Sequence, residues 1–203
     1  MNTFEQIYQQ IENRQTNSNL RVNYPSDVDP KAAETFFDIM ENYDYPDEFD
    51  WLNTLLTSAT QQTKRDLFTY KSADKDTIFH KCYDNYEFLE EIAEHISDID
   101  CYQEGKHGLT VLELAATEVC DETFEHMLEI GVPAEALRNP DLLWDVSFDG
   151  REASDLADES GLSIDEFVKK TIFYRISLLE EHGYTVPISI KDQLSTMEFA
   201  ISF

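Results

Sequence analysis

Two similar four-residue segments, separated by one long interval, are the feature that most constrains the fold. Thr77-Ile78-Phe79-His80 lies 33 residues before Thr110-Val111-Leu112-Glu113. An internal period in the thirties is typical of proteins in which pairs of helices stack on their neighbours. The period therefore predicts stacked helix pairs in the middle of this chain.

The stretch from Gly108 to Gly131 resembles one unit of the ankyrin repeat. Thr110-Val111-Leu112-Glu113 stands where that family has Thr-Pro-Leu-His, Ala115-Ala116 where it has a packed alanine pair, and Leu128 with Gly131 where it has Leu-Leu-x-x-Gly. The resemblance implies an all-α, ankyrin-like helical repeat solenoid. It also implies that the chain binds other proteins through the repeats.

Two further units resemble the family less closely. In the earlier one, His80 takes the histidine position, which implies a hydrogen bond to the neighbouring loop, and Cys82 takes an alanine position. This unit closes at Asp98-Ile99-Asp100, which is similar to the Asp-Val-Asn that ends a repeat. A third unit begins at 149–157 and closes at 178–183, with its second helix lengthened to run from Ser163 to His182.

The first 70 residues show helical periodicity without a recognisable motif. Four helices are expected: 3–13, a helix that begins at Pro30 after an Asp29 N-cap, 49–59 and 63–70. We expect this segment, 1–70, to form a helical cap on the repeats at 71–187, because a repeat stack leaves an apolar face open at its end. A tail at 188–203 completes the chain.

The most pronounced feature of the composition is its negative charge. The 203 residues contain 42 Asp and Glu against 15 Lys and Arg, a net charge of -27. Nucleic acid and anionic lipid are disfavoured as direct partners of such a chain, whereas a basic protein is favoured. The oligomeric state is left open by the sequence.

Cysteine content and apolar content bear on location. Three cysteines are too few for a disulfide scaffold and favour reduced thiols. No stretch approaches the roughly 18 apolar residues of a membrane span, and the first residues have no signal-peptide pattern. We expect a cytoplasmic protein, or one in a host cytoplasm if a secretion route without a signal delivers it.

Acidic residues recur at helical spacing in both units. The spacing predicts four carboxylates on one helix face in each unit, and repeat stacking would set the two stripes side by side. The stripe residues are Glu87, Glu91, Glu94 and Asp98, and then Glu118, Glu122, Glu125 and Glu129. They form either a docking surface for a Lys/Arg-rich patch or the ordinary solvated face of an acidic protein.

The resemblance to ankyrin repeats nominates a second surface, made of the hairpin tips and the exposed face of each first helix. In the earlier unit these contact positions are Ala73, Asp74, Asp76, Asp84 and Asn85. In the next unit they are Lys106, His107, Leu109, Thr117 and Glu118.

No motif for catalysis, cofactor binding or metal binding is present. The chain lacks Gly-x-Ser-x-Gly, Gly-x-x-x-x-Gly-Lys-Ser/Thr and Gly-x-Gly-x-x-Gly. Its histidines and cysteines have neither Cys-x2-Cys nor His-x3-His spacing. We therefore expect no enzyme activity, no cofactor and no metal.

These features together favour a non-catalytic protein-protein interaction module. Its expected role is an acidic inhibitor that sequesters or occludes a basic partner, such as a nuclease or another nucleic-acid-binding protein, as immunity and phage or pathogen counter-defence proteins do. Nucleic-acid mimicry is one variant of that role. The alternative is a scaffold or effector adaptor in which acidity serves only solubility.

Overall fold

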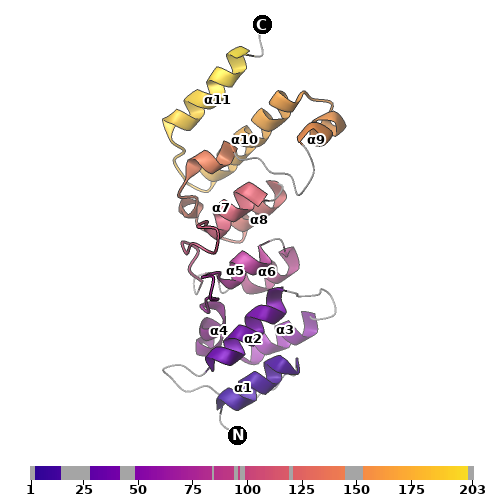
Figure 1. Cartoon of the computed structure of the whole chain (residues 1–203), viewed down its shortest axis with the longest axis vertical. Helices are drawn as coiled ribbons and strands as arrows, with labels where there is room; N and C mark the ends of the chain where they lie inside the picture. The colour runs from indigo at the N-terminus through magenta and orange to yellow at the C-terminus, as the bar shows by residue number, and fades with distance from the viewer. Residues whose placement is uncertain are drawn as a thin grey trace. The chain divides into compact units, whose positions relative to one another are not determined.

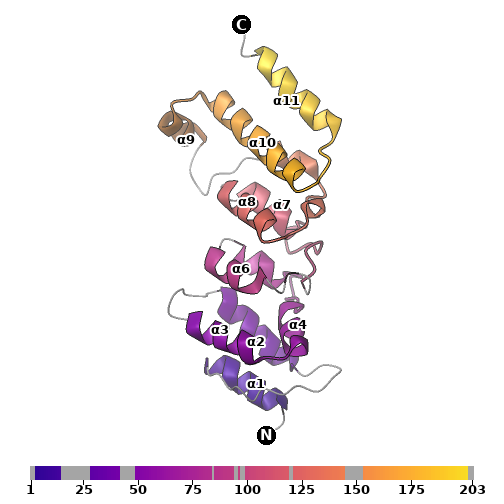
Figure 2. The ribbon, with the colours of Figure 1, turned by 180° about the vertical axis from the view of Figure 1, so that it is seen from behind.

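The computed structural model describes residues 3–14, 28–41, 49–83, 85–93, 96, 99–118, 121–144 and 153–200. The regular elements in these ranges are α-helices and 3-10 helices, and no strand occurs in them. The predicted all-α class is confirmed. The ribbon is drawn in Figure 1 and, from behind, in Figure 2.

The chain divides into two compact units, Met1–Gly108 and Leu109–Phe203. This division falls inside the predicted repeat segment 71–187. The segment boundaries drawn from the sequence, at 70 and 187, stay predictions. Each unit is described by itself.

The first unit contains six α-helices within its described residues. They are α1 (Thr3–Glu12), α2 (Pro30–Glu41), α3 (Phe49–Ser58), α4 (Gln61–Phe68), α5 (Ile78–Cys82) and α6 (Tyr86–Ile92). The four helices expected before residue 70 are all present. Helix α4 begins two residues earlier than predicted, because the Thr60 side chain caps it by accepting the backbone N–H of Thr63 at 3.2 Å.

The start of α2 follows the predicted cap. The Asp29 carboxylate accepts the backbone N–H of Lys31 at 2.8 Å, and Pro30 occupies the first helical position. Helix α2 packs against α1, as both views of the ribbon show (Figures 1 and 2). Its Phe36 is fully buried, with ring centroids 6.1 Å from Phe68 and 6.4 Å from Trp51. An aromatic cluster thus joins α2, α3 and α4 in one core.

The second unit contains five α-helices and two 3-10 helices within its described residues. They are α7 (Val111–Glu118), α8 (Asp121–Glu129), η2 (Ala134–Ala136), η3 (Pro140–Trp144), α9 (Ala153–Ser160), α10 (Ile164–Glu181) and α11 (Ile188–Ala200). Helices α7 and α8 pack on each other, and α10 packs on α8, α9 and α11. The lengthened helix predicted from Ser163 to His182 is confirmed as α10. Within the predicted tail, residues 188–200 form α11.

Small residues allow close packing at the centre of the second unit. Ala115 and Ala116 of α7 are fully buried, as predicted for the packed alanine pair, and so is Phe124 of α8. The guanidinium of Arg175, which is also fully buried, lies over the Phe124 ring at 5.8 Å and donates from Nη1 to the Ala116 carbonyl at 2.8 Å. Arg175 thereby anchors α10 to both helices of the α7–α8 pair.

Candidate functional site

A buried contact ties the first Thr-x-x-His segment to the loop that follows its helix pair. The backbone N–H of Thr77 donates to Nδ1 of His80 at 3.1 Å, and both side chains are buried. The neighbouring Asp76 accepts the backbone N–H of Lys106 at 2.7 Å. A Cβ added to Gly105 would lie 2.4 Å from Asp76 Oδ1 and 2.6 Å from His80 Cδ2. Only glycine lets this loop approach so closely.

The second unit has a corresponding contact, with a carboxylate in place of the imidazole. Glu113 is buried, and its Oε2 accepts the backbone N–H of Thr110 at 2.9 Å. Its Oε1 accepts the backbone N–H groups of Arg138 and Asn139, at 2.9 Å and 2.8 Å. Three backbone donors therefore converge on one carboxylate.

The two contacts, which we call the loop clamps, lie in register with the sequence period. Glu113 holds residues 25 and 26 positions further along the chain. Gly105 and Lys106 stand at the same offsets from His80. Each clamp thus fixes the backbone of the loop that leaves its helix pair, so that exposed residues at the loop tip project from a rigid base.

Several contact residues nominated from the sequence lie in the first compact unit, Met1–Gly108. Some of them are exposed, and the side chains of the others bind the backbone. Asp74, Lys106 and His107 are exposed, and Lys106 Nζ lies 3.4 Å from an Asp74 carboxylate oxygen. Asp76 is only 7% exposed, and its carboxylate serves the loop clamp. Asn85 caps α6 by accepting the backbone N–H of Phe88 at 3.0 Å. The loop tips therefore carry both signs of charge in a strongly acidic chain.

The remaining nominated positions are distributed as follows. Ala73 is exposed at the tip of the first loop, and Leu109 of the second unit is half-buried. Thr117 is buried and donates its hydroxyl hydrogen to the Leu114 carbonyl at 3.2 Å. Asp84 lies outside the described residues.

The second acidic stripe does not lie on one helix as predicted. Glu118 is the last residue of α7, whereas Glu122, Glu125 and Glu129 belong to α8. The 0, 4, 7, 11 spacing places side chains on one face only within a continuous helix, and α8 begins at Asp121. The expectation of a four-residue stripe on one helix is therefore wrong, although the three residues of α8 keep same-face spacing.

We call Glu122, Glu125 and Glu129 the α8 stripe. The structure describes the surroundings of two of these carboxylates. Glu125 is half-buried and accepts the hydroxyl hydrogen of Tyr174 on α10. Glu129 is exposed, and one of its oxygens lies 4.0 Å from Nδ1 of His126. Glu129 is therefore the more accessible of the two to a basic partner.

The first stripe is described only in part. Glu87 and Glu91 belong to α6, and the Glu91 side chain is half-buried. The predicted stripe residues Glu94 and Asp98 lie outside the described residues, and the side chains of Glu87, Glu118 and Glu122 are likewise not described. Because the stripes belong to separate compact units, their predicted side-by-side arrangement stays a prediction.

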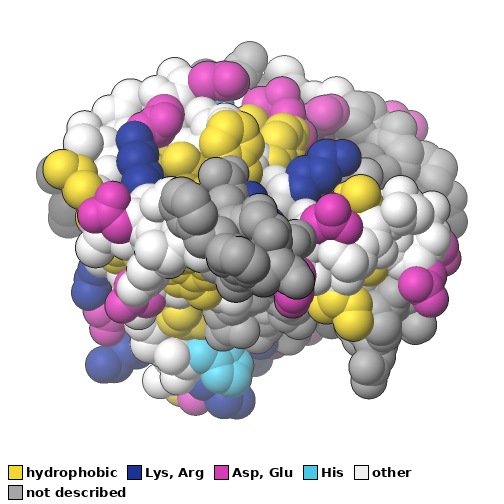
Figure 3. Space-filling model, turned by 90° about the horizontal axis from the view of Figure 1, so that it is seen from above, with side chains coloured by type: hydrophobic (Ala, Val, Ile, Leu, Met, Phe, Trp, Pro, Cys, Tyr) yellow, Lys and Arg dark blue, Asp and Glu magenta, His cyan; other side chains and the backbone are white. Residues whose placement is uncertain are grey.

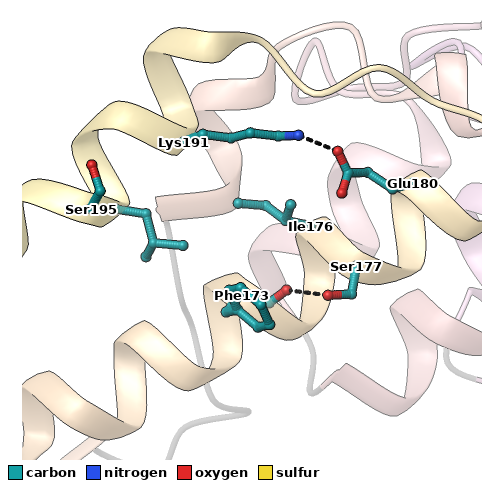
Figure 4. Close-up of a pocket in the computed structure, with 7 residues that line it drawn as sticks. Phe173, Ile176, Ser177, Glu180, Lys191 and Ser195 are labelled. Carbon is teal, nitrogen blue, oxygen red and sulfur yellow. Dashed lines mark hydrogen bonds and ion pairs between the residues drawn. The ribbon is translucent and has the colours of Figure 1, made fainter. Parts of the chain in front are cut away.

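A pocket of about 270 Å³ lies between α10 and α11 (Figure 4). Phe173, Ile176 and Leu194 supply apolar walls, and serine hydroxyls lie among them. An ion pair between Glu180 and Lys191 joins the two helices beside the pocket. The lining is Phe173, Ile176, Ser177, Glu180, Lys191, Leu194 and Ser195. We call this site the α10–α11 groove.

The shifted titratable groups are poorly suited to nucleophilic chemistry. Burial, with a smaller contribution from the Asp100 carboxylate, raises the pKa of the Cys101 thiol to about 11. The thiol is thus protonated at neutral pH and is a weak nucleophile. Burial also raises the pKa of Tyr184, with the carboxylates of Glu135 and Glu113 acting in the same direction.

Among the residues that the structure describes, no three His, Cys, Asp or Glu side chains gather in a way that would hold a metal ion. No helix there combines the length and the apolar character needed to cross a membrane.

Comparison of the chain with family models, with curated proteins and with solved structures found no match. The ankyrin-like interpretation therefore depends on the residues and contacts of this chain alone.

Three functional features were missed at the sequence level. Glu113 departs from the family's histidine, yet its position at the end of the repeated tetrad was the signal for the second loop clamp. Arg175 lies among apolar residues at helical spacing, which is a signal for a buried cation. The α10–α11 groove joins residues of two helices across a turn, and nothing in the local pattern indicated it.

Proposed function

We propose that this chain is a non-catalytic binding protein, built on ankyrin-like helical repeats, that sequesters or occludes a basic protein partner. The net charge of -27 is the observation that supports a basic protein as the partner. A surface with this charge attracts basic proteins at long range and repels nucleic acid and anionic lipid.

The repeat component of the proposal is supported by the loop clamps. Two helix pairs separated by one period each bind the backbone of their following loop at equivalent positions, Lys106 and Asn139, once through the Asp76 carboxylate and once through the Glu113 carboxylate. A scaffold of this kind presents loop tips and helix faces as a preformed binding surface, which lowers the entropic cost of binding.

Capture of partners from the native host lysate at two ionic strengths tests the proposal. The immobilised chain should retain a basic nuclease or nucleic-acid-binding protein at about 20 mM salt and much less of it at about 150 mM, because screening shortens the range of charge attraction. Added DNA should compete if the chain mimics nucleic acid. If the retained proteins are the same at both salt concentrations, the inhibitor role is overturned and the scaffold role gains.

Charge-neutral variants locate the contact. Glu122→Gln, Glu125→Gln and Glu129→Gln together remove three charges from α8, and the affinity for the captured partner should fall at least tenfold if these residues bind it (about 1.4 kcal/mol). Glu34→Gln, Asp38→Asn and Asp50→Asn are the matched control, since all three side chains are exposed elsewhere. An equal loss in both variants would mean that net charge, and not the α8 stripe, determines binding.

A further inference from the structure

Several large hydrophobic side chains of the second unit are exposed to solvent. Among the described residues, the exposed large hydrophobics include Ile164, Phe173, Tyr174 and Ile188, all on α10 or α11. Phe173 is 61% exposed and Ile188 is 75% exposed. On the face seen from above, hydrophobic side chains lie at several separate places among acidic and basic ones (Figure 3).

The α10–α11 groove has the dimensions of a site for one side chain. Its volume of about 270 Å³ is below the roughly 300–1,000 Å³ of pockets that enclose drug-sized molecules. Of its apolar lining, Ile176 and Leu194 are buried, whereas Phe173 is exposed. An apolar side chain placed there would cover surface that the chain itself leaves in water.

The polar atoms of the groove can accept hydrogen bonds. Ser177 donates its hydroxyl hydrogen to the Phe173 carbonyl at 3.0 Å, and Ser195 donates to the Asp192 carbonyl at 2.9 Å. The lone pairs of both hydroxyl oxygens are then available to a donor. An indole, which is large, apolar and carries a single N–H donor, matches this combination.

Charge determines which kind of chain can present that side chain. The second unit carries twenty Asp and Glu against six Lys and Arg. Beside the groove, Glu180 and Lys191 pair with each other, and Glu181 and Asp192 are exposed. An acidic segment approaching this unit is repelled and a basic one is attracted. A second copy of this chain is opposed by the same charge.

We infer that the α10–α11 groove receives one large aromatic side chain, best an indole, presented by a basic segment of another protein. This inference rests on the proposed function for the basic character of the partner. It adds which type of side chain anchors the partner and where on this chain that side chain binds. Aromatic anchors in a desolvated pocket contribute most of the binding free energy at many interfaces, and the charged rim then contributes specificity and rate.

Two synthetic peptides separate the groove from the charge. Acetyl-Lys-Lys-Trp-Lys-Lys-amide and its counterpart with alanine at the centre carry the same charge, so the ratio of their affinities for the full chain reports the indole alone. We expect the tryptophan peptide to bind about tenfold more tightly. It should shift the methyl NMR resonances of Ile176 and Leu194, whereas the alanine peptide should not.

Two variants of α11 introduce the same substitution, serine to phenylalanine, at two different positions. Ser195→Phe fills the groove, and Ser189→Phe adds the same ring to an exposed serine outside the lining. The tryptophan gain should disappear in the first variant and persist in the second. Equal affinities of the two peptides, or a gain that survives Ser195→Phe, would overturn the inference.

Two further outcomes keep this inference distinct from the proposed function. If the affinity of the alanine peptide does not fall with salt while the tryptophan gain persists, the charge proposal fails and the groove stands. If analytical ultracentrifugation without peptide shows self-association that Ser195→Phe abolishes and Ser189→Phe retains, the groove belongs to a second copy of the chain and the inference fails.

Discussion

At the scale of single residues, one repeated position is filled by two chemically different side chains. His80 and Glu113 both end a tetrad that begins with threonine, and both accept the backbone N–H of that threonine. What the position requires is therefore a buried acceptor, which imidazole and carboxylate both provide. A histidine pattern alone describes this requirement too narrowly.

Glu113→Gln tests the value of the carboxylate. Its Oε1 and Oε2 together accept three backbone N–H groups, and an amide offers only one acceptor oxygen. At least one buried donor loses its partner, so the free energy of unfolding should fall by about 1–3 kcal/mol in urea denaturation. Glu135→Gln, an exposed change of the same type, should leave the midpoint unaltered. Equal midpoints for the two variants would contradict the proposed role of Glu113.

At the scale of the elements, helix starts were predictable where the residues that determine them lie next to the start in the sequence. Ser163 and Glu166 form a reciprocal cap at the first turn of α10, with the Ser163 hydroxyl accepting the Glu166 N–H at 3.3 Å and Glu166 accepting the Ser163 N–H at 3.0 Å. Asp29 and Pro30 set the start of α2 in a similar local way. The start of α2 was expected from its Asp-Pro cap and that of α10 from the helical spacing of its apolar residues, and in the structure each start depends on residues within one turn.

A break between two helices was expected here from the resemblance to a helix pair, but before Glu118, whereas α7 extends to Glu118 and α8 begins at Asp121. No proline or glycine stands between Glu118 and Asp121, so the carboxylate spacing looks continuous. Ala115 and Ala116 of α7 and Phe124 of α8 are all fully buried, and the two helices pack on each other. The α10–α11 groove was missed because the packing of two helices across a turn cannot be predicted from the sequence of either helix alone.

Ser163→Ala should destabilise α10 in a pH-dependent way. The Ser163 hydroxyl, followed by its backbone N–H, lowers the pKa of Glu166. A carboxyl with a lowered folded-state pKa contributes stability above its unfolded value of about 4.3, and this contribution is lost as pH falls through the folded pKa. The urea midpoint should therefore fall at pH 7, and the difference from the unsubstituted chain should shrink below about pH 4.

The control for this prediction is Ser160→Ala, an exposed serine at the last position of α9 that caps no helix start. It should change the midpoint little at either pH. A difference between Ser163→Ala and the unsubstituted chain that stays constant from pH 7 to the acid range would show that Glu166 takes no part in the cap.

At the scale of the whole molecule, repulsion among like charges opposes the folded state. With a net charge of -27, the compact chain holds its carboxylates closer together than the unfolded chain does, and salt screens this cost. Raising NaCl from about 20 mM to about 300 mM should raise the thermal midpoint, by about 2–4 °C for each kcal/mol of repulsion that is screened. Differential scanning calorimetry measures the shift.

Potassium chloride is the control salt, because screening depends on ionic strength and not on which monovalent cation is present. The two salts should give the same rise. A midpoint that falls with salt would mean that ion pairs such as Lys106 with Asp74 contribute more to stability than the net repulsion removes.

The loop clamps also bear on how the chain acquires its structure during synthesis. The bonds from Asp76 to Lys106 and from Glu113 to Asn139 span only 30 and 26 residues. Contacts this local close small loops and favour fast folding. Each clamp can form soon after its loop leaves the ribosome, while the downstream chain is still being translated. Folding from the N-terminus onward, one helix pair at a time, is the order that this architecture favours.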